Sequence, residues 1–227
     1  KGLVKSGMTS VIIPGTVRRI CANAFADCKR LASVSFRDGL VSIGMMAFDG
    51  CESLRSITFP TILKEIGEWA FSRCTSLREV KFNEGLMSVA EWAFSECSSL
   101  VSVELPSSVI SIDQYSFAWC SNLLVCRSDE GLETIGKRAF SGCSNLECVD
   151  LPRSLCEIGD DAFNGCWKLN NMIFHGDVPN GFTKSRIEDG GKYYTGMTVF
   201  YPLKYGQYWQ RVANDMPTVS FSAIQGT

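Results

Sequence analysis

The chain has 227 residues, a formal net charge of −2 and 45% hydrophobic residues, a composition typical of a soluble globular protein with ample material for a core. The near-neutral charge and the lack of any Lys/Arg run argue against binding to a nucleic-acid backbone. No apolar stretch approaches the roughly 18 residues that would indicate a membrane span, so no membrane insertion is expected within this chain. The chain opens at KGLVKSGMTS, without a start Met or an apolar signal region, and we expect any export signal to lie upstream of Lys1.

A phrase of the form Ala-Phe-x-x-Cys recurs along the chain at a fixed interval. Residues 66–80 read IGEWAFSRCTSLREV, and residues 89–103 read VAEWAFSECSSLVSV. The Phe of the phrase recurs every 23 residues without insertion or deletion, as Phe25, Phe48, Phe71, Phe94, Phe117, Phe140 and Phe163. A period of roughly 20 to 29 residues with Leu-x-x-Val-x-Phe as its apolar core is the signature of a leucine-rich-repeat solenoid. We therefore predict an α/β solenoid with one strand of a parallel sheet in each 23-residue coil.

Each coil is expected to begin with a strand whose residues alternate between the core and solvent. In the strand at residues 54–59, Ile57 and Phe59 would point inward and Thr58 outward. Eight such strands are predicted, the first within Met8–Ile13 and the eighth within Leu169–Phe174, and a ninth is expected at Met197–Tyr201.

After the strand and its turn, the chain must return to the start of the next coil. In the coil that contains Ile66 and Gly67, we expect Ala70, Phe71 and Cys74 to form a short helical or 3₁₀ return turn. The turn directly after the strand alternates between a form with Pro and a form with an acid before Gly. The Pro form occurs at Pro60, Pro106 and Pro152, and the acidic form at Asp38–Gly39, Glu84–Gly85 and Glu130–Gly131. The structural unit is thus 23 residues and the duplicated unit 46, which separates the acids by about 10 Å, too far to share one calcium ion.

Seven of the eleven cysteines lie in one column, at Cys28, Cys51, Cys74, Cys97, Cys120, Cys143 and Cys166. Equivalent Cβ vectors in parallel coils point the same way, so we interpret the column as buried, reduced thiols rather than disulfides. Cys126 is expected to point inward, Cys21 to lie in a column of small residues, and Cys148 and Cys156 to face outward. The chain has no Cys-x-x-Cys pair for zinc, and its one histidine, His175, lies beyond the last full repeat. No metal, cofactor or catalytic site is therefore predicted, and the protein is not expected to be an enzyme.

The tail differs from the repeats. The step from Phe174 to Tyr201 is 27 residues rather than 23, and the tail holds five of the six tyrosines together with Trp209. Bulky amphipathic residues of this kind would cover the last coil, and we assign this role to residues 193–210. The predicted organisation is residues 1–7 as an N-terminal flank or partial repeat, 8–176 as the solenoid, and 177–227 as an extended loop, a last strand and a C-terminal cap.

The repeated phrase Ile-Gly-x-x-Ala-Phe-x-x-Cys-x-x-Leu-x-x-Ile-x-Phe-Pro, seen in IGKRAFSGCSNLECVDLP, resembles the BspA-like class of leucine-rich repeats over roughly residues 8 to 210. The tail VFYPLKYGQYW is similar to the closing segment of that class. The resemblance implies a mostly bacterial or protist protein, often exported, of a group in which several members are linked with adhesion to host matrix, host cells or other microbes. It implies no catalytic residues and no fixed binding motif.

These observations favour a non-catalytic binding or adhesion module of a cell-surface or secreted protein, with a protein or glycan ligand and no nucleic acid as partner. The alternative is a structural spacer or an intracellular interaction scaffold, which the many free cysteines favour.

One column of surface residues is unusual for its aromatic content. Successive coils place Met46, Trp69, Trp92, Tyr115, Arg138 and Asp161 in the same slot. Exposed rings about 4.8 Å apart would form a flat strip for sugar faces or an extended peptide, so Trp69, Trp92, Tyr115 and Arg138 are the candidate binding residues. The alternative is an aromatic ladder that only stabilises the stack of coils. Trp119 and Trp167 lie in other columns and are given no role.

The outward positions of the sheet offer a second candidate surface. They are small or mixed in charge, which suits either a protein partner or an inert solvated face. They are Ser33, Ser35, Ser56, Thr58, Glu79, Lys81, Ser102, Glu104, Arg127 and Asp150.

Overall fold

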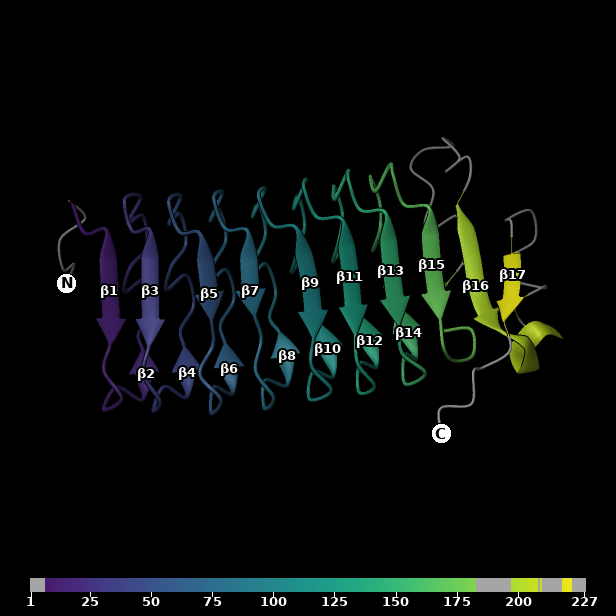
Figure 1. The fold of residues 1–227 in the computed structure, drawn as a ribbon, viewed down its shortest axis with the longest axis horizontal. Helices are drawn as coiled ribbons and strands as arrows, with labels where there is room; N and C mark the ends of the chain where they lie inside the picture. Colours follow the sequence, from purple (N-terminus) through teal and green to yellow (C-terminus); the bar gives the residue numbers. More distant parts are fainter. Residues whose placement is uncertain (1–6, 183–196, 208, 210–217, 222–227) are drawn as a thin grey trace.

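The computed structural model describes residues 7–182, 197–207, 209 and 218–221 of the chain. Its coils stack side by side into an elongated solenoid whose broad face is a parallel sheet (Figure 1). The strands of this main sheet are β1 (Ser10–Ile13), β3 (Ser33–Phe36), β5 (Ser56–Thr58), β7 (Glu79–Lys81), β9 (Ser102–Leu105), β11 (Val125–Ser128), β13 (Cys148–Leu151), β15 (Asn171–Phe174), β16 (Thr198–Pro202) and β17 (Thr218–Phe221).

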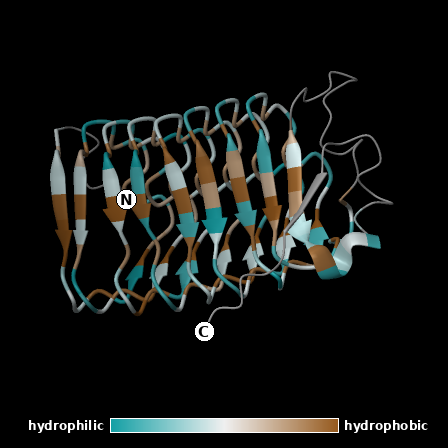
Figure 2. Cartoon of the chain, turned by 45° about the vertical axis from the view of Figure 1, so that its right-hand side comes forward, coloured by the Kyte–Doolittle hydropathy of each residue, from teal (hydrophilic) through white to brown (hydrophobic). Residues whose placement is uncertain are grey.

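Strand partners in the main sheet are one repeat apart, as in the pairs Val11 with Val34 and Ile57 with Val80. Hydrophobic and hydrophilic residues alternate along the strands (Figure 2). The eight predicted strands and the ninth at β16 are confirmed. β17, which pairs in parallel with β16, was not predicted.

Each full coil contributes a second strand, so the prediction of one strand per coil is wrong. These two-residue strands form a second parallel sheet that lies behind the main sheet and runs in the opposite direction (Figure 1). They are β2 (Arg19–Ile20), β4 (Ser42–Ile43), β6 (Glu65–Ile66), β8 (Ser88–Val89), β10 (Ser111–Ile112), β12 (Thr134–Ile135) and β14 (Glu157–Ile158). The inward residue of each strand lies over its equivalent in the next coil, so the backbone groups beside it pair between coils instead of being left unsatisfied.

The segments that return the chain to the main sheet are turns, not the short helical or 3₁₀ segments predicted. Alternate residues bond to the next coil rather than along their own. Phe94 N donates to Ser116 O at 2.8 Å, and Glu96 N donates to Ala118 O at 2.8 Å. These bonds between coils take the place of the i to i−4 bonds of a helix. Among the described residues, helical structure is confined to the tail, where η1 (Leu203–Tyr205) is a 3₁₀ helix.

A ladder of phenylalanine rings fills the space between the sheets and the return turns. The seven rings of the repeated phrase stack with centroids 5.0 to 5.5 Å apart and interplanar angles of 10° or less. From Phe48 to Phe163 these side chains are at most 1% exposed. No coil could bury its ring alone, so each coil depends on its two neighbours for its core.

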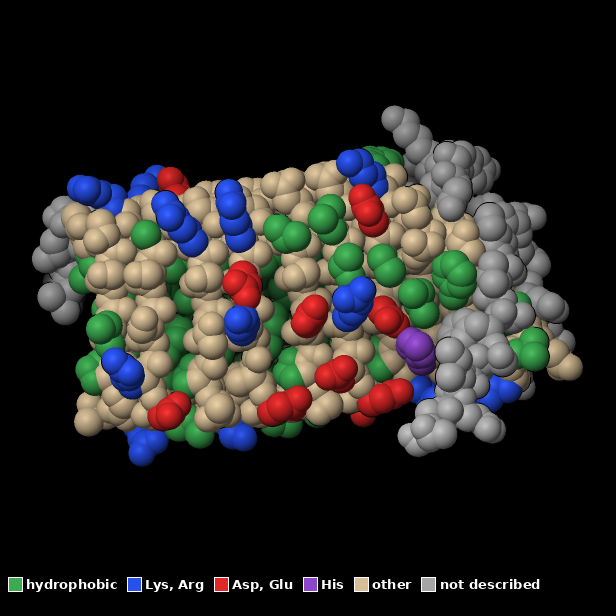
Figure 3. Space-filling view, viewed as in Figure 1, with side chains coloured by type: hydrophobic (Ala, Val, Ile, Leu, Met, Phe, Trp, Pro, Cys, Tyr) green, Lys and Arg blue, Asp and Glu red, His purple; other side chains and the backbone are tan. Residues whose placement is uncertain are grey.

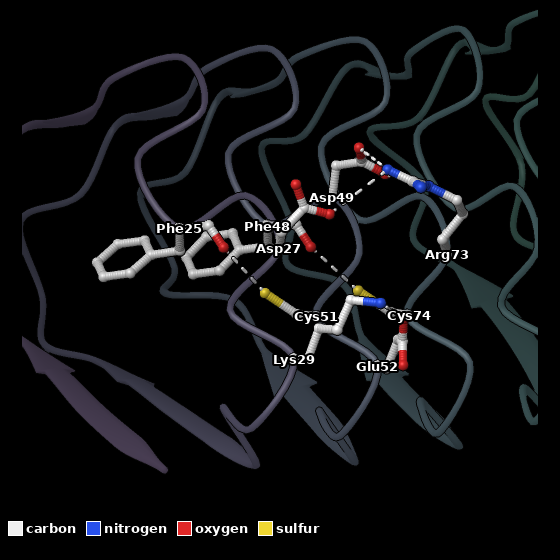
Figure 4. Close-up of polar contacts among 9 residues, drawn as sticks. All are labelled: Phe25, Asp27, Lys29, Phe48, Asp49, Cys51, Glu52, Arg73 and Cys74. Atoms are coloured by element: carbon white, nitrogen blue, oxygen red, sulfur yellow. Dashed lines mark hydrogen bonds and ion pairs between the residues drawn. The ribbon is translucent and has the colours of Figure 1, made fainter. Parts of the chain in front are cut away.

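The column of cysteines is buried, and its thiols are hydrogen-bonded to the phenylalanine ladder. Each thiol from the second coil onward donates to the Phe carbonyl of the preceding coil, as Cys51 Sγ to Phe25 O and Cys74 Sγ to Phe48 O, both at 3.3 Å (Figure 4). All eleven cysteines are free, and Cys126 is buried as predicted. Burial raises the pKa of Cys51 to about 12 and holds the pKa of Cys74 well above its usual range. The buried thiols are therefore protonated and unreactive at neutral pH.

Charged groups also join neighbouring coils near the N-terminal end. Arg73 Nε donates to Asp49 Oδ1 at 3.0 Å, and its Nη2 pairs with the other carboxylate oxygen (Figure 4). Lys29 Nζ lies 2.7 Å from Glu52 Oε1. Both pairs span one coil boundary and are partly exposed, so each contributes at most about 1 kcal/mol.

The alternating turns of the sequence are matched by alternating contacts between coils. Gly85 and Gly131 have φ angles of 119° and 134°, which favour glycine. Ser108, in the next coil, accepts a bond from Gly85 N at 2.9 Å and donates to Leu86 O at 2.8 Å. Ser154 likewise accepts from Gly131 N at 2.9 Å. The acids of these turns, Asp38, Glu84 and Glu130, are exposed, as predicted.

The described part of the tail centres on Trp209. This ring is fully buried, with centroids 4.6 Å from Phe174, 5.4 Å from Phe182 and 5.7 Å from Tyr201. The wider cap proposed for residues 193–210 stays a prediction, because residues 193–196, 208 and 210 lie outside the described residues.

Candidate functional site

Three of the candidate residues form one continuous stack of rings on the flank of the solenoid. The ring centroids of Trp69 and Trp92 are 4.5 Å apart at an interplanar angle of 7°, and those of Trp92 and Tyr115 are 4.0 Å apart at 5°. All three side chains are partly exposed. The fixed step of 23 residues produces this arrangement, because it places each ring directly over its equivalent in the next coil. We call Trp69, Trp92 and Tyr115 the aromatic stack.

The backbone of the aromatic stack is left-handed. Every residue of its column from Asn23 to Asp161 has a φ angle between 53° and 58°. Asn and Asp tolerate this region, whereas a bulky residue there is strained by roughly 1–2 kcal/mol. The fold therefore requires the conformation, but the conformation does not favour an aromatic side chain.

Trp119 extends the aromatic stack sideways. Its centroid lies 5.8 Å from Trp92 and 6.2 Å from Tyr115, with the rings within about 20° of parallel at 21° and 18°, and its side chain is 45% exposed. A Cβ added to Gly142 would lie 2.6 Å from Trp119 Cδ1, so the indole rests directly on this glycine. The sequence interpretation gave Trp119 no role. The signal that could have found it is the glycine at the same slot in the following coil, at Gly142, which leaves room for a large neighbour.

Arg138 closes the C-terminal end of the aromatic stack. Its Nη1 donates to Tyr115 Oη at 3.2 Å, and its Nε donates to Asp161 Oδ2 at 3.1 Å. The hydrogen bond with Tyr115 and the Asp161 carboxylate raise the pKa of Arg138. At the middle of the stack, Trp92 Nε1 donates to Glu91 Oε1 at 2.9 Å. The structure thus brings all four candidate residues together, in a row along the solenoid axis.

The rings face one another, so the aromatic stack presents ring edges to solvent rather than the flat strip expected from the sequence. A sugar packs its C–H groups on a ring face, and the faces within this stack are already covered by neighbouring rings. A row of apolar edges bordered by Glu91 and Arg138 suits an extended polypeptide, which has both apolar side chains and backbone groups that bond to charged residues.

The main sheet offers the second surface considered from the sequence. Its outward residues form a row in which charge alternates between coils, from Lys81 through Glu104 and Arg127 to Asp150 (Figure 3). His175 Nε2 lies 2.8 Å from Asp150 Oδ1 at one end of this row. Alternating charges within one row favour no single sign of partner.

Other kinds of site can be considered for the described residues alone. Within residues 7–182, 197–207, 209 and 218–221, no three His, Cys, Asp or Glu side chains gather as metal ligands would. None of the helices in that part of the chain is long and apolar enough to traverse a bilayer.

Comparison with known proteins gives one family and several solved structures. A model of the BspA type leucine rich repeat region matches residues 4–124 and 125–184, with six copies. The chain is similar to a leucine rich repeat protein of T. pallidum, with 34% identity over 71% of this chain and 78% of that one and a TM-score of 0.67. It is also similar to a leucine-rich repeat protein of Eubacterium ventriosum, with 26% identity, 82% of this chain, 48% of that chain and a TM-score of 0.67.

A leucine rich cell surface protein of Faecalibacterium prausnitzii shares 24% identity over 80% of this chain and 63% of that one, with a TM-score of 0.37. No curated protein sequence is significantly similar to the chain.

Proposed function

This chain belongs to the BspA-type leucine-rich-repeat family, and we propose that it is a non-catalytic binding module, exposed at the cell surface or secreted, that holds a protein ligand against the aromatic stack. Trp69, Trp92 and Tyr115 supply the apolar contact. Arg138 supplies hydrogen-bond donors at one end, and Trp119 widens the surface. Membership of the family supports a binding role on a repeat scaffold.

The observation that carries the proposal is the left-handed backbone beneath the rings. Three bulky residues in this conformation cost about 3–6 kcal/mol in total. The two ring pairs contribute only about 1–3 kcal/mol beyond the area they bury. Asn23 shows that the fold accepts an asparagine in the same slot at a φ of 58°. Stability alone therefore gives little reason to keep aromatic residues here, whereas a ligand that contacts the rings gives one.

The alternative, a structural spacer or intracellular scaffold, rested on the free cysteines. Eight of the eleven are buried, and burial protects a thiol from oxidation in any compartment. The cysteines consequently favour neither location. Edge-on rings favour a protein ligand over a glycan, although both belong in the test.

The test is a variant in which Trp69, Trp92 and Tyr115 are all replaced by Asn. Asn suits the left-handed slots, so relief of backbone strain offsets part of the lost stacking, and we expect the melting temperature to change by only a few degrees. Binding to a panel of immobilised matrix proteins and glycans should fall more than tenfold for the true ligand, since three aromatic contacts of about 0.5–1.5 kcal/mol each are removed.

Met46→Asn is the matched control, because Met46 occupies the same slot at a φ of 53° beside the aromatic stack. It should bind every probe as the wild type does. If the triple variant also binds every probe as the wild type does, the aromatic stack serves only the architecture and the proposal is wrong.

A further inference from the structure

Two arginines in neighbouring coils border a shallow hollow at the start of the main-sheet strands. The hollow is lined by Arg55, Ser76, Arg78 and Ser99. Arg78 N donates to Arg55 O at 2.9 Å, so the two arginines occupy equivalent positions in adjacent coils. Basic side chains gather along this edge of the sheet over the N-terminal coils (Figure 3).

Neither guanidinium has a partner among the described residues. Both side chains are exposed, and no hydrogen bond or ion pair joins either to an acid. The nearby acids are engaged elsewhere: Glu52 lies 2.7 Å from Lys29 Nζ, and Glu79 lies 3.3 Å from Lys81 Nζ. Like charges placed directly opposite on parallel strands repel each other, which favours an anion between them.

The lining of the hollow indicates the chemistry of that anion. Its four side chains are all hydrogen-bond donors, and the hydroxyls of Ser76 and Ser99 make no hydrogen bond in the described structure. No apolar side chain would receive a hydrophobic peptide, and no aromatic ring would stack on a nucleic-acid base. A hydroxyl-rich, charged chain fits this lining.

The spacing of the arginines further selects the anionic group. Equivalent residues of adjacent coils are about 4.8 Å apart. One guanidinium can bind both oxygens of a carboxylate in a bidentate pair, which leaves the second arginine without an acceptor. A tetrahedral ester such as sulfate or phosphate has three terminal oxygens and can bridge both guanidiniums.

We propose that the hollow between Arg55 and Arg78 binds a tetrahedral oxyanion ester, sulfate or phosphate, carried by a polysaccharide. The site lies apart from the aromatic stack and does not depend on the proposed function. Ser76 and Ser99 bond to the ester or to sugar hydroxyls beside it. The sequence shows no basic run because the two arginines are 23 residues apart.

The test compares four probes built on one backbone: dextran, carboxymethyl dextran, dextran sulfate and dextran phosphate. Titration calorimetry at physiological ionic strength should show binding of the sulfate or phosphate form and little binding of the other two. The tighter of the two esters identifies the source of the oxyanion. The double variant Arg55→Gln with Arg78→Gln should lose about tenfold or more in affinity for that ester.

The matched control is Arg37→Gln with Arg153→Gln. These two arginines are also exposed and without an ion pair, but they lie in separate, non-adjacent coils. The control changes the net charge by the same amount and should keep affinity within about twofold. Equal losses in both double variants would mean a general charge effect, and unchanged binding in the Arg55/Arg78 variant would mean no site; either result overturns the proposal. Equally tight binding of carboxymethyl dextran also overturns it. The triple variant of the aromatic stack should bind the ester normally, so the two hypotheses fail independently.

Discussion

Replacing Phe94 with Ala should be far more damaging than the same change at Phe25, although both belong to the same ladder. Phe94 is fully buried and stacks on Phe71 at 5.3 Å and on Phe117 at 5.5 Å, with an edge contact to Phe82 at 5.6 Å. A buried Phe→Ala change typically costs about 3–5 kcal/mol. For a chain of this size that corresponds to a fall in melting temperature of about 6–20 °C.

Phe25 sits at the end of the same ladder, and its side chain is only half-buried. It stacks on a single ring, Phe48, at 5.0 Å. Partial burial and one ring pair suggest a cost of about 1–2 kcal/mol, or about 2–8 °C.

Urea unfolding followed by circular dichroism, with thermal scans alongside, measures both differences. Phe94→Ala should lower the free energy of unfolding at least twice as much as Phe25→Ala. Equal losses at the two positions would refute the reasoning, because they would show that a ring with neighbours on both sides gains nothing over a ring with one.

Two further predictions concern the buried thiols and the glycine beneath Trp119. Burial raises the pKa of Cys51 and Cys126 from 9.0 to about 12, so unfolded thiols lose their protons above about pH 9 while folded ones keep theirs. The free energy of unfolding should therefore fall as the pH rises from about 9 towards 12, and the buried cysteines should react with a thiol reagent only after denaturation; reaction in the native state would contradict this. Gly142→Ala should shift tryptophan fluorescence and lower stability more than Gly165→Ala. The two glycines have φ angles of 77° and 76°, but a Cβ at Gly142 would meet the Trp119 ring at 2.6 Å, whereas at Gly165 the nearest atoms are backbone at 3.3 Å. Equal effects would show that Trp119 does not rest on Gly142.

The main sheet was predictable from the sequence because its information is repeated in every coil. Residues such as Ile57 and Phe59 alternate with polar ones and recur at a fixed step. The second sheet was missed because a two-residue strand carries no alternation. The return turns were misassigned because Ala-Phe-x-x-Cys has the spacing of a helix face, and bonds such as Phe94 N to Ser116 O depend on the neighbouring coil rather than on local sequence.

The candidate site was predictable to the same extent. The column rule correctly brings Trp69, Trp92 and Tyr115 into contact, because it fixes their register. It does not fix ring orientation, which follows from the left-handed backbone, and it does not reach Trp119, which approaches from a different column. Whether a ligand uses these rings is a property of the ligand as well as the chain.

The serine that holds each glycine turn has a consequence for how such an array can change in length. Ser108 bonds to the turn of Gly85, and Ser154 bonds to the turn of Gly131, so a serine coil must follow a glycine coil. Insertion or deletion of 46 residues preserves this order at every boundary. A change of 23 residues would place two coils of the same kind side by side and leave one turn without its hydroxyl. Lengthening or shortening this protein by pairs of coils is therefore the route that keeps its turns bonded.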